Sequence, residues 1–120
     1  MTQNTITRAD LSHFTGTENW YRHAIARNVL YTDGIKYLAE RAGAYWLLDE
    51  IALAQSLPRI KAEPFQRWHL LVRPNHTARL TCDDGNYNIR LSKEISFTDF
   101  PLDEIAIYLT GNVIMLTSEY

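Results

Sequence analysis

The sequence predicts an α+β fold, in which N-terminal helices pack on a C-terminal antiparallel β-meander. Apolar residues recur at helical spacing between residues 35 and 57, and from residue 65 onward they alternate with polar residues. Two later segments, Asp83-Asp84-Gly85-Asn86 and Gly111-Asn112, are typical of hairpin turns. We therefore expect residues 1–120 to form a single domain, with residues 1–6 as a mobile N-terminus.

The first elements are short. Thr7 and Asp10 have the spacing of a capping box, which predicts a short helix that ends near Gly16. The aromatic and β-branched content of residues 20–23 and 28–32 indicates strands.

Two helices follow. Asp33-Gly34 predicts a turn with a helix over residues 35–42, which Gly43 ends. Residues 44–57 form the strongest helix candidate, because apolar side chains cover it almost all round until Pro58. A helix with this composition is normally central and packed on more than one side.

The second half has the period of strands. Residues 65–73 place Trp68 and Leu70 on one face, and a second strand carries residues 78–82. A long alternation over residues 87–98 is interrupted by Lys93, which predicts a bend or bulge between two shorter strands. Two further strands are expected at the end of the chain, over residues 105–110 and 113–116.

Composition excludes several classes of protein. The chain is 46% hydrophobic and 22% charged, as globular domains are, and its net charge of −2 is too small to imply a partner. No apolar run approaches the roughly 18 residues that span a bilayer, so we expect no membrane partner. The polar N-terminus and the single Cys82 favour a cytoplasmic location.

Charge is unevenly distributed along the chain. Residues 1–79 hold ten Lys/Arg and seven Asp/Glu, whereas residues 80–120 hold two and seven. This asymmetry predicts opposed electrostatic faces, provided that the two regions do not interleave in the fold. The alternative is that the charges solvate two ordinary surfaces.

Signals for metal, cofactor and nucleophile chemistry are weak. His69, His76 and Cys82 lack the short spacing of a zinc site, and Cys82 shares its strand face with apolar residues. Asp49 and Glu50 supply polar edge to an apolar helix, which is a simpler explanation than acid–base catalysis. We expect no metal, no cofactor and no catalytic residue among these groups.

A basic row suggests nucleic-acid binding as one alternative. Strand parity places Arg67, His69 and Arg73 on the face opposite Trp68, and Arg79 follows on the next strand. Such a row fits a phosphate backbone, although solvated or internally paired arginines explain it as well.

Residues 20–23, Trp-Tyr-Arg-His, concentrate functional side chains, and Tyr31 and Asp33 follow soon after. If the segment is extended, Tyr21 and His23 point to one side and Trp20 and Arg22 to the other. A cluster of Tyr31, Asp33 and His23 allows three readings: a buried network that fixes the fold, a binding surface, or a small active site.

Three blocks of sequence resemble a family of small bacterial proteins that are carried by phages, plasmids and integrative elements. The blocks cover most of the chain: LSHFTGTENWYRH, LYTDGIKYLAERAGAYWLLDEIA and FTDFPLDEIAIYLTGNVIMLTSEY. The resembled family has no known function. It therefore implies no reaction and no site residues. It implies only that the gene lies on a mobile element and is expressed in a bacterial host.

We therefore expect a non-enzymatic interaction protein that binds a host or element-encoded protein. The resemblance suggests an inhibitor of a host defence system, of the anti-CRISPR or anti-restriction kind. The alternatives are a nucleic-acid-binding module with Arg67, Arg73 and Arg79, and a small enzyme with Tyr31, Asp33 and His23. The sequence leaves the oligomeric state and the exposed side of residues 19–23 open.

Overall fold

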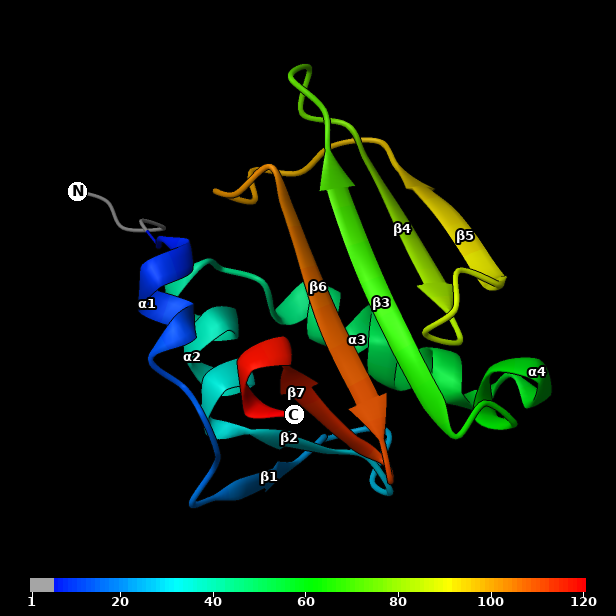
Figure 1. Ribbon diagram of the computed structural model, residues 1–120. Helices are drawn as coiled ribbons and strands as arrows, with labels where there is room; N and C mark the ends of the chain where they lie inside the picture. Colours follow the sequence, from blue (N-terminus) through cyan, green and yellow to red (C-terminus); the bar gives the residue numbers. More distant parts are fainter. Residues whose placement is uncertain (1–5) are drawn as a thin grey trace.

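The computed structural model describes residues 6–120 (Figure 1). Residues that cap helices in the sequence lie at the starts of its first two helices. The capping box is confirmed: the Thr7 hydroxyl accepts a hydrogen bond from the Asp10 amide, and the Asp10 carboxylate accepts one from the Thr7 amide. The helices are α1 (Arg8–Ser12), α2 (Asp33–Arg41), α3 (Tyr45–Leu53) and α4 (Pro58–Lys61), with 3₁₀ turns η1 (Ala54–Ser56) and η2 (Thr117–Glu119).

The helix predicted over residues 44–57 is shorter than expected. Helix α3 gives way to η1, and Leu57 is extended, with φ −82° and ψ 123°. The cause is Pro58, whose ring disfavours a helical residue before it and whose fixed φ suits the first position of a new helix. Pro58 therefore ends one helix and begins α4.

Seven strands form one sheet in the described residues, in the order β1-β2-β7-β6-β3-β4-β5. Their bounds are β1 (Trp20–Arg22), β2 (Leu30–Thr32), β3 (Phe65–Val72), β4 (Ala78–Asp83), β5 (Ile89–Ile95), β6 (Glu104–Thr110) and β7 (Val113–Leu116). Each neighbouring pair is antiparallel except β2 and β7, which are parallel.

The α+β class is confirmed, but the predicted order of helices followed by a meander is wrong. Strands β1 and β2 precede α2, and β6 pairs with β3 rather than with β5. Strand β7 then turns back and joins β2, which makes the sheet mixed. The turn residues of the sequence specify only local hairpins, whereas these two contacts join residues far apart in the chain.

One face of the sheet carries the helices. Trp68 and Leu70 of β3 are buried on that face, as their parity predicts, in a core that includes Leu47 and Ile51 of α3. Arg67 and His69 lie on the other side, which we call the open face; η2 folds over part of it (Figure 1). The rings of Phe65, Tyr108 and Tyr120 pack together there, with centroids 4.9 to 5.4 Å apart.

The core contains one fully buried amide. The Gln66 side chain donates to the Ile60 and Glu63 carbonyls and exchanges hydrogen bonds with Gln55, while its oxygen accepts from the Trp68 indole. Because each of its polar atoms has a partner, this buried group joins α4 to β3 without an unsatisfied donor.

Strand β5 is continuous through Lys93, so the predicted bend or bulge at this residue is wrong. The register shift lies three residues earlier in β5, where Cys82 pairs with Leu91 and Asp83 with Ile89, so Arg90 is the extra residue of a bulge. Lys93 faces the helices, and its Nζ reaches the Glu50 carboxylate of α3 at 2.8 Å. An edge position lets the long side chain extend over apolar surface and still pair its charge.

The hairpin predicted at Gly111-Asn112 is confirmed between β6 and β7. Both residues have positive φ, 57° and 62°, which is the geometry of a tight two-residue turn. The predicted mobile N-terminus lies outside the described residues except for Ile6, which is buried in the core.

Candidate functional site

Strand β1 divides the predicted binding residues between two sides. Trp20 and Arg22 are exposed, Tyr21 is half-buried, and His23 is only 4% exposed. The side that meets water is therefore that of Trp20 and Arg22. The strand is also an edge of the sheet.

Both ring nitrogens of His23 have structural partners. The amides of Ile25 and Ala26 donate to Nδ1, at 3.2 and 3.0 Å, so Nδ1 carries no proton. Nε2 lies 2.7 Å from the Asp49 carboxylate of α3 and donates to it. This imidazole anchors the β1–β2 loop to α3, which leaves neither nitrogen free to act on a substrate.

Asp33 forms a separate network at the start of α2. Its carboxylate accepts hydrogen bonds from the amides of Glu18 and Asn19 and from the Tyr21 hydroxyl, the last at 2.9 Å. Partial desolvation works to raise the pKa of Asp33, but these donors outweigh it and hold the pKa below the usual value. The Asp33 contact in turn raises the pKa of Tyr21.

The predicted cluster of Tyr31, Asp33 and His23 does not form. Asp33 binds Tyr21, His23 binds Asp49, and Tyr31 stacks on Tyr21 with ring centroids 5.6 Å apart. The prediction failed because it grouped residues by chain proximity, whereas the partner of His23 comes from α3. Asp33 and His23 each bind backbone amides of a neighbouring loop, which supports the interpretation that these residues stabilise the fold.

The basic row does lie on the open face, but its members are paired. Arg67 binds Asp83 at 3.1 Å, His69 lies 2.8 Å from Glu104, and the remaining two arginines, Arg73 and Arg79, share Glu94. Hydrogen bonds from these two arginines lower the pKa of Glu94. The row is a set of internal ion pairs.

The basic and acidic regions of the sequence interleave. Among residues 6–120, seven ion pairs, including His69 with Glu104, join a residue before 80 to one after it. Strand β3 of the basic region lies between β6 of the acidic region and β4, which crosses the boundary between the two regions. The predicted opposed electrostatic faces are therefore not supported.

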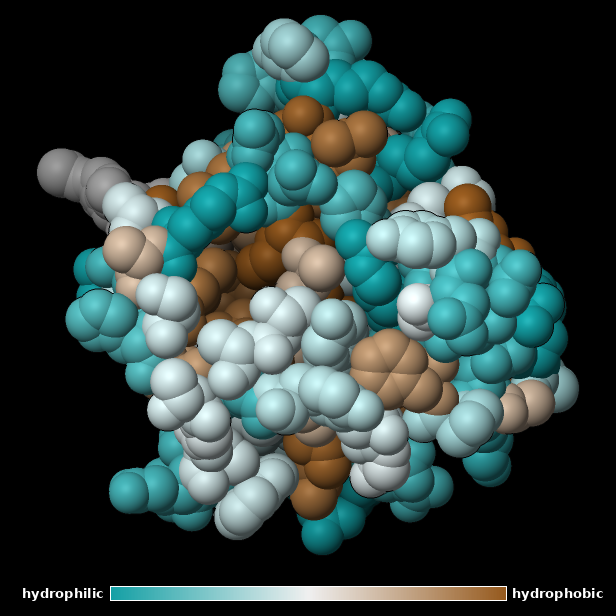
Figure 2. All heavy atoms as spheres, viewed as in Figure 1, coloured by the Kyte–Doolittle hydropathy of each residue, from teal (hydrophilic) through white to brown (hydrophobic). Residues whose placement is uncertain are grey.

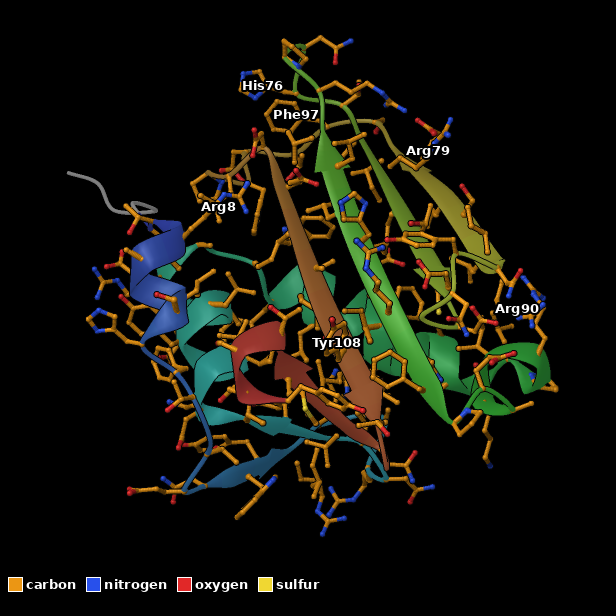
Figure 3. All side chains as sticks on the ribbon, in the orientation of Figure 1. Arg8, His76, Arg79, Arg90, Phe97 and Tyr108 are labelled. Atoms are coloured by element: carbon orange, nitrogen blue, oxygen red, sulfur yellow. The ribbon has the colours of Figure 1, made fainter. Side chains whose placement is uncertain are left out.

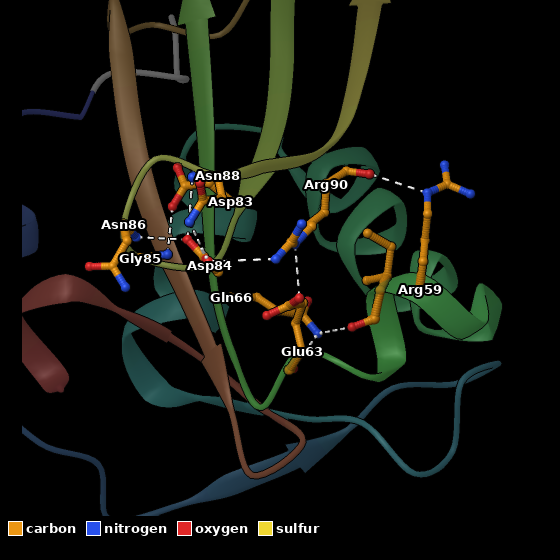
Figure 4. A network of polar contacts seen from close by, with 10 residues as sticks. Arg59, Glu63, Gln66, Asp83, Asp84, Gly85, Asn86, Asn88 and Arg90 are labelled. Carbon is orange, nitrogen blue, oxygen red and sulfur yellow. Dashed lines mark hydrogen bonds and ion pairs between the residues drawn. The ribbon is translucent and has the colours of Figure 1, made fainter.

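A polar network closes the end of the sheet near α4 (Figure 4). Arg90 lies between Glu63, at 2.8 Å, and Asp84, at 3.7 Å. Asp84 also accepts hydrogen bonds from Asn86 and Asn88, which lowers its pKa and orders the β4–β5 loop. The charges of Arg90, Glu63 and Asp84 at this end of the sheet are therefore paired with one another.

Cys82 is fully buried, and burial raises the pKa of its thiol to about 12, so it is not activated as a nucleophile. In the described part of the chain, no group of three His, Cys, Asp or Glu side chains is placed to hold a metal ion. Residues 6–120 also contain no helix long and apolar enough to cross a membrane.

A hollow of about 300 Å³ opens on the open face between α1, β6 and η2. Figure 2 shows hydrophobic side chains on its floor, which includes Leu11, Ile105 and Leu116. Two arginines line this hollow, and both form ion pairs: Arg8 with Asp103 (Figure 3) and Arg67 with Asp83. Its charges are already engaged.

A second hollow, which we call the loop groove, lies between the β1–β2 loop and the end of α3, with a volume of about 520 Å³. Ile25 is 71% exposed and Leu53 44% exposed at its walls, and Val29 and Ala52 are buried beneath them. Its other lining residues are Ala26, Arg27, Asn28, Gln55, Ser56, Lys61 and Asn112, so no carboxylate lines it among residues 6–120.

Sequence reasoning missed the loop groove. The available signal was the nearly all-round apolar surface of residues 44–57, which predicted packing on more than one side. The structure leaves Leu53 exposed on a side where no other element of residues 6–120 covers it. Ile25 gave no signal, because a single isoleucine in a loop has no period.

A family model described as a family of unknown function (DUF6876) matches residues 5–120. No curated protein and no solved structure matches the chain.

Proposed function

The chain belongs to the DUF6876 family, whose function is unknown, and we propose that it is a non-enzymatic protein-binding module. The binding surface is the loop groove together with the exposed side of β1. We call this surface the binding edge; it is represented by Trp20, Arg22, Ile25 and Leu53.

One observation carries the proposal: a buried histidine holds an exposed isoleucine in place. Through Nδ1, His23 binds the amides of Ile25 and Ala26, and through Nε2 it binds α3. An exposed apolar side chain on a rigid backbone loses little entropy on binding, which favours association with another protein.

The exposed side of β1 extends the same surface. Trp20 is 56% exposed, and the Arg22 guanidinium donates to the Arg27 carbonyl at the lip of the loop groove. Tryptophan and arginine are residue types that carry much of the affinity at protein interfaces. An apolar groove with these neighbours supports a protein partner more than a nucleic acid.

The other two hypotheses have less support. The arginine row is paired internally, so phosphate binding would have to break Arg67, Arg73 and Arg79 away from their carboxylates. The candidate acid–base group, His23, is buried with both nitrogens bound.

The resemblance to proteins of mobile elements extends the proposal. We propose that the chain comes from a phage or other mobile element of a bacterium and acts in the host cytoplasm on a host defence protein, of the CRISPR or restriction kind. This extension depends on the sequence blocks and not on the geometry.

A pull-down from bacterial host lysate tests the binding function, with the tagged chain as bait. We expect a stoichiometric protein partner that Ile25→Asp abolishes and Ile89→Asp retains, since Ile89 is 60% exposed on β5, away from the groove. Thermal melting of both variants verifies folding. Absence of a stoichiometric partner, or equal capture by both variants, would contradict the proposal.

A further inference from the structure

Two cations line the loop groove, and neither has a carboxylate partner within residues 6–120. Arg27 and Lys61 line the groove, and Arg22 binds the Arg27 carbonyl. Within residues 6–120 none of the three forms an ion pair, whereas the arginines of the open face do. The local charge of the groove is therefore positive.

The nearby carboxylates of α3 are already engaged. Asp49 accepts from His23, and Glu50 binds Lys93 at 2.8 Å. Since no Asp or Glu of residues 6–120 lines the groove, its two cations are not neutralised from within the chain. A ligand that brings carboxylates would complement them.

The walls between the cations require apolar side chains in the ligand. The exposed side chains of Ile25 and Leu53 line the groove, together with the buried residues Val29 and Ala52. A volume of about 520 Å³ is within the usual range of ligand sites, roughly 300–1,000 Å³. Burial of these apolar surfaces would contribute most of the affinity, and the charges would set orientation and specificity.

We propose that the loop groove binds an acidic amphipathic segment of a partner protein. Its apolar side chains enter between Ile25 and Leu53, and its Asp or Glu side chains pair with Arg27 and Lys61. This inference rests on the proposed binding function and adds the chemistry of the partner. A nucleic acid supplies the negative charge but not the apolar side chains.

Selection from a random peptide library displayed on phage, against the purified full chain, tests the chemistry directly. We expect enriched peptides that combine apolar residues with an excess of Asp and Glu. Synthetic copies should lose about tenfold or more in affinity when their acids are replaced by Asn and Gln. They should also weaken near 1 M salt, where the Debye length falls to about 3 Å.

Variants of the chain locate the peptide. Arg27→Glu and Lys61→Glu should each weaken binding by about tenfold, as should Ile25→Asp. Arg41→Glu is the matched control, because Arg41 forms no ion pair within residues 6–120 and does not line the groove, and it should leave affinity unchanged. Circular dichroism verifies the fold of each variant.

The outcomes separate this inference from the proposed function. Enriched peptides without an acidic excess, or with equal affinity for Arg27→Glu and Arg41→Glu, would overturn the inference but leave a protein partner from the pull-down standing. Failure of both experiments would reject both. Tighter groove-dependent binding of a random single-stranded DNA oligonucleotide than of any peptide would replace the protein partner by a nucleic acid.

Discussion

The carboxylate of Glu119 accepts a hydrogen bond from the backbone amide of Gly34 at 3.1 Å. It also accepts from the Thr32 hydroxyl at 2.6 Å and from the Leu116 amide at 2.9 Å. The end of the chain thus caps helix α2, and the negative charge lies at the positive end of that helix. This contact joins η2, β7 and α2.

Glu119→Ala should lower the free energy of unfolding by about 1 to 2 kcal/mol, the range observed for loss of a helix cap. Urea denaturation measures the change. Glu18→Ala is the control, because no described hydrogen bond involves the Glu18 carboxylate, and it should have little effect. Equal stability of the two variants would show that the cap is not stabilising.

Gly34→Ala should also destabilise the protein, although alanine is the better helix former. A Cβ at this position would lie 2.6 Å from the Glu119 Oε1 and 2.7 Å from a methyl group of Leu116. Neither neighbour can move freely, because the first is held by hydrogen bonds and the second is buried. We expect a loss of about 1 to 2 kcal/mol.

Two comparisons test this explanation of Gly34. Gly16→Ala should be nearly neutral, since nothing lies within 4 Å of the added carbon. In the double variant Gly34→Ala, Glu119→Ala, the two losses should not add, because the first substitution already disturbs the carboxylate that the second removes. If the two losses of unfolding free energy were additive, the added methyl group of Gly34→Ala would not act through Glu119.

His23→Phe should release the β1–β2 loop. The amides of Ile25 and Ala26 lose their acceptor, so their hydrogen exchange should accelerate while that of Gly85, in the β4–β5 loop, stays unchanged. Loss of a buried hydrogen-bonding group should cost about 1 to 3 kcal/mol. Asp49→Asn keeps an acceptor oxygen, and its effect should be smaller; equal exchange in His23→Phe and the wild type would reject the anchor.

Asp33 should contribute to stability only above acidic pH. Its pKa in the folded state is lowered from 3.8, so the unfolded chain binds a proton more readily. The contribution is complete at neutral pH and is lost as the pH falls through 3.8 toward the folded value. Asp33→Asn should therefore be destabilising at neutral pH, and the difference from wild type should shrink at about pH 3.

Urea denaturation at the two pH values measures this effect. Asp99→Asn serves as the control for loss of a carboxylate, because the Asp99 side chain forms no hydrogen bond within residues 6–120, and it should be nearly neutral for stability at neutral pH. A pH-independent loss in Asp33→Asn would mean that the hydrogen bonds of the carboxylate do not favour its charged form.

Patterns that repeat over a few residues predict local structure in two cases. The period of two in β3 identified Trp68 and Leu70 as buried, and Gly111-Asn112 identified the β6–β7 hairpin. The bend expected at Lys93 was wrong, because its partner Glu50 comes from a helix that precedes it by 43 residues. The sequence contained no signal for that contact.

The sequence by itself determined most of the helices and strands and the parity of the strand side chains, because these follow from the periodicity, caps and turns of neighbouring residues. Only the tertiary structure decided which charges pair, that His23 meets Asp49 rather than Asp33, and that Arg27 and Lys61 stay unpaired beside Ile25 and Leu53. The physical reason is that each of these contacts depends on how β2, β7 and α3 pack, and packing brings together residues that are distant in the chain.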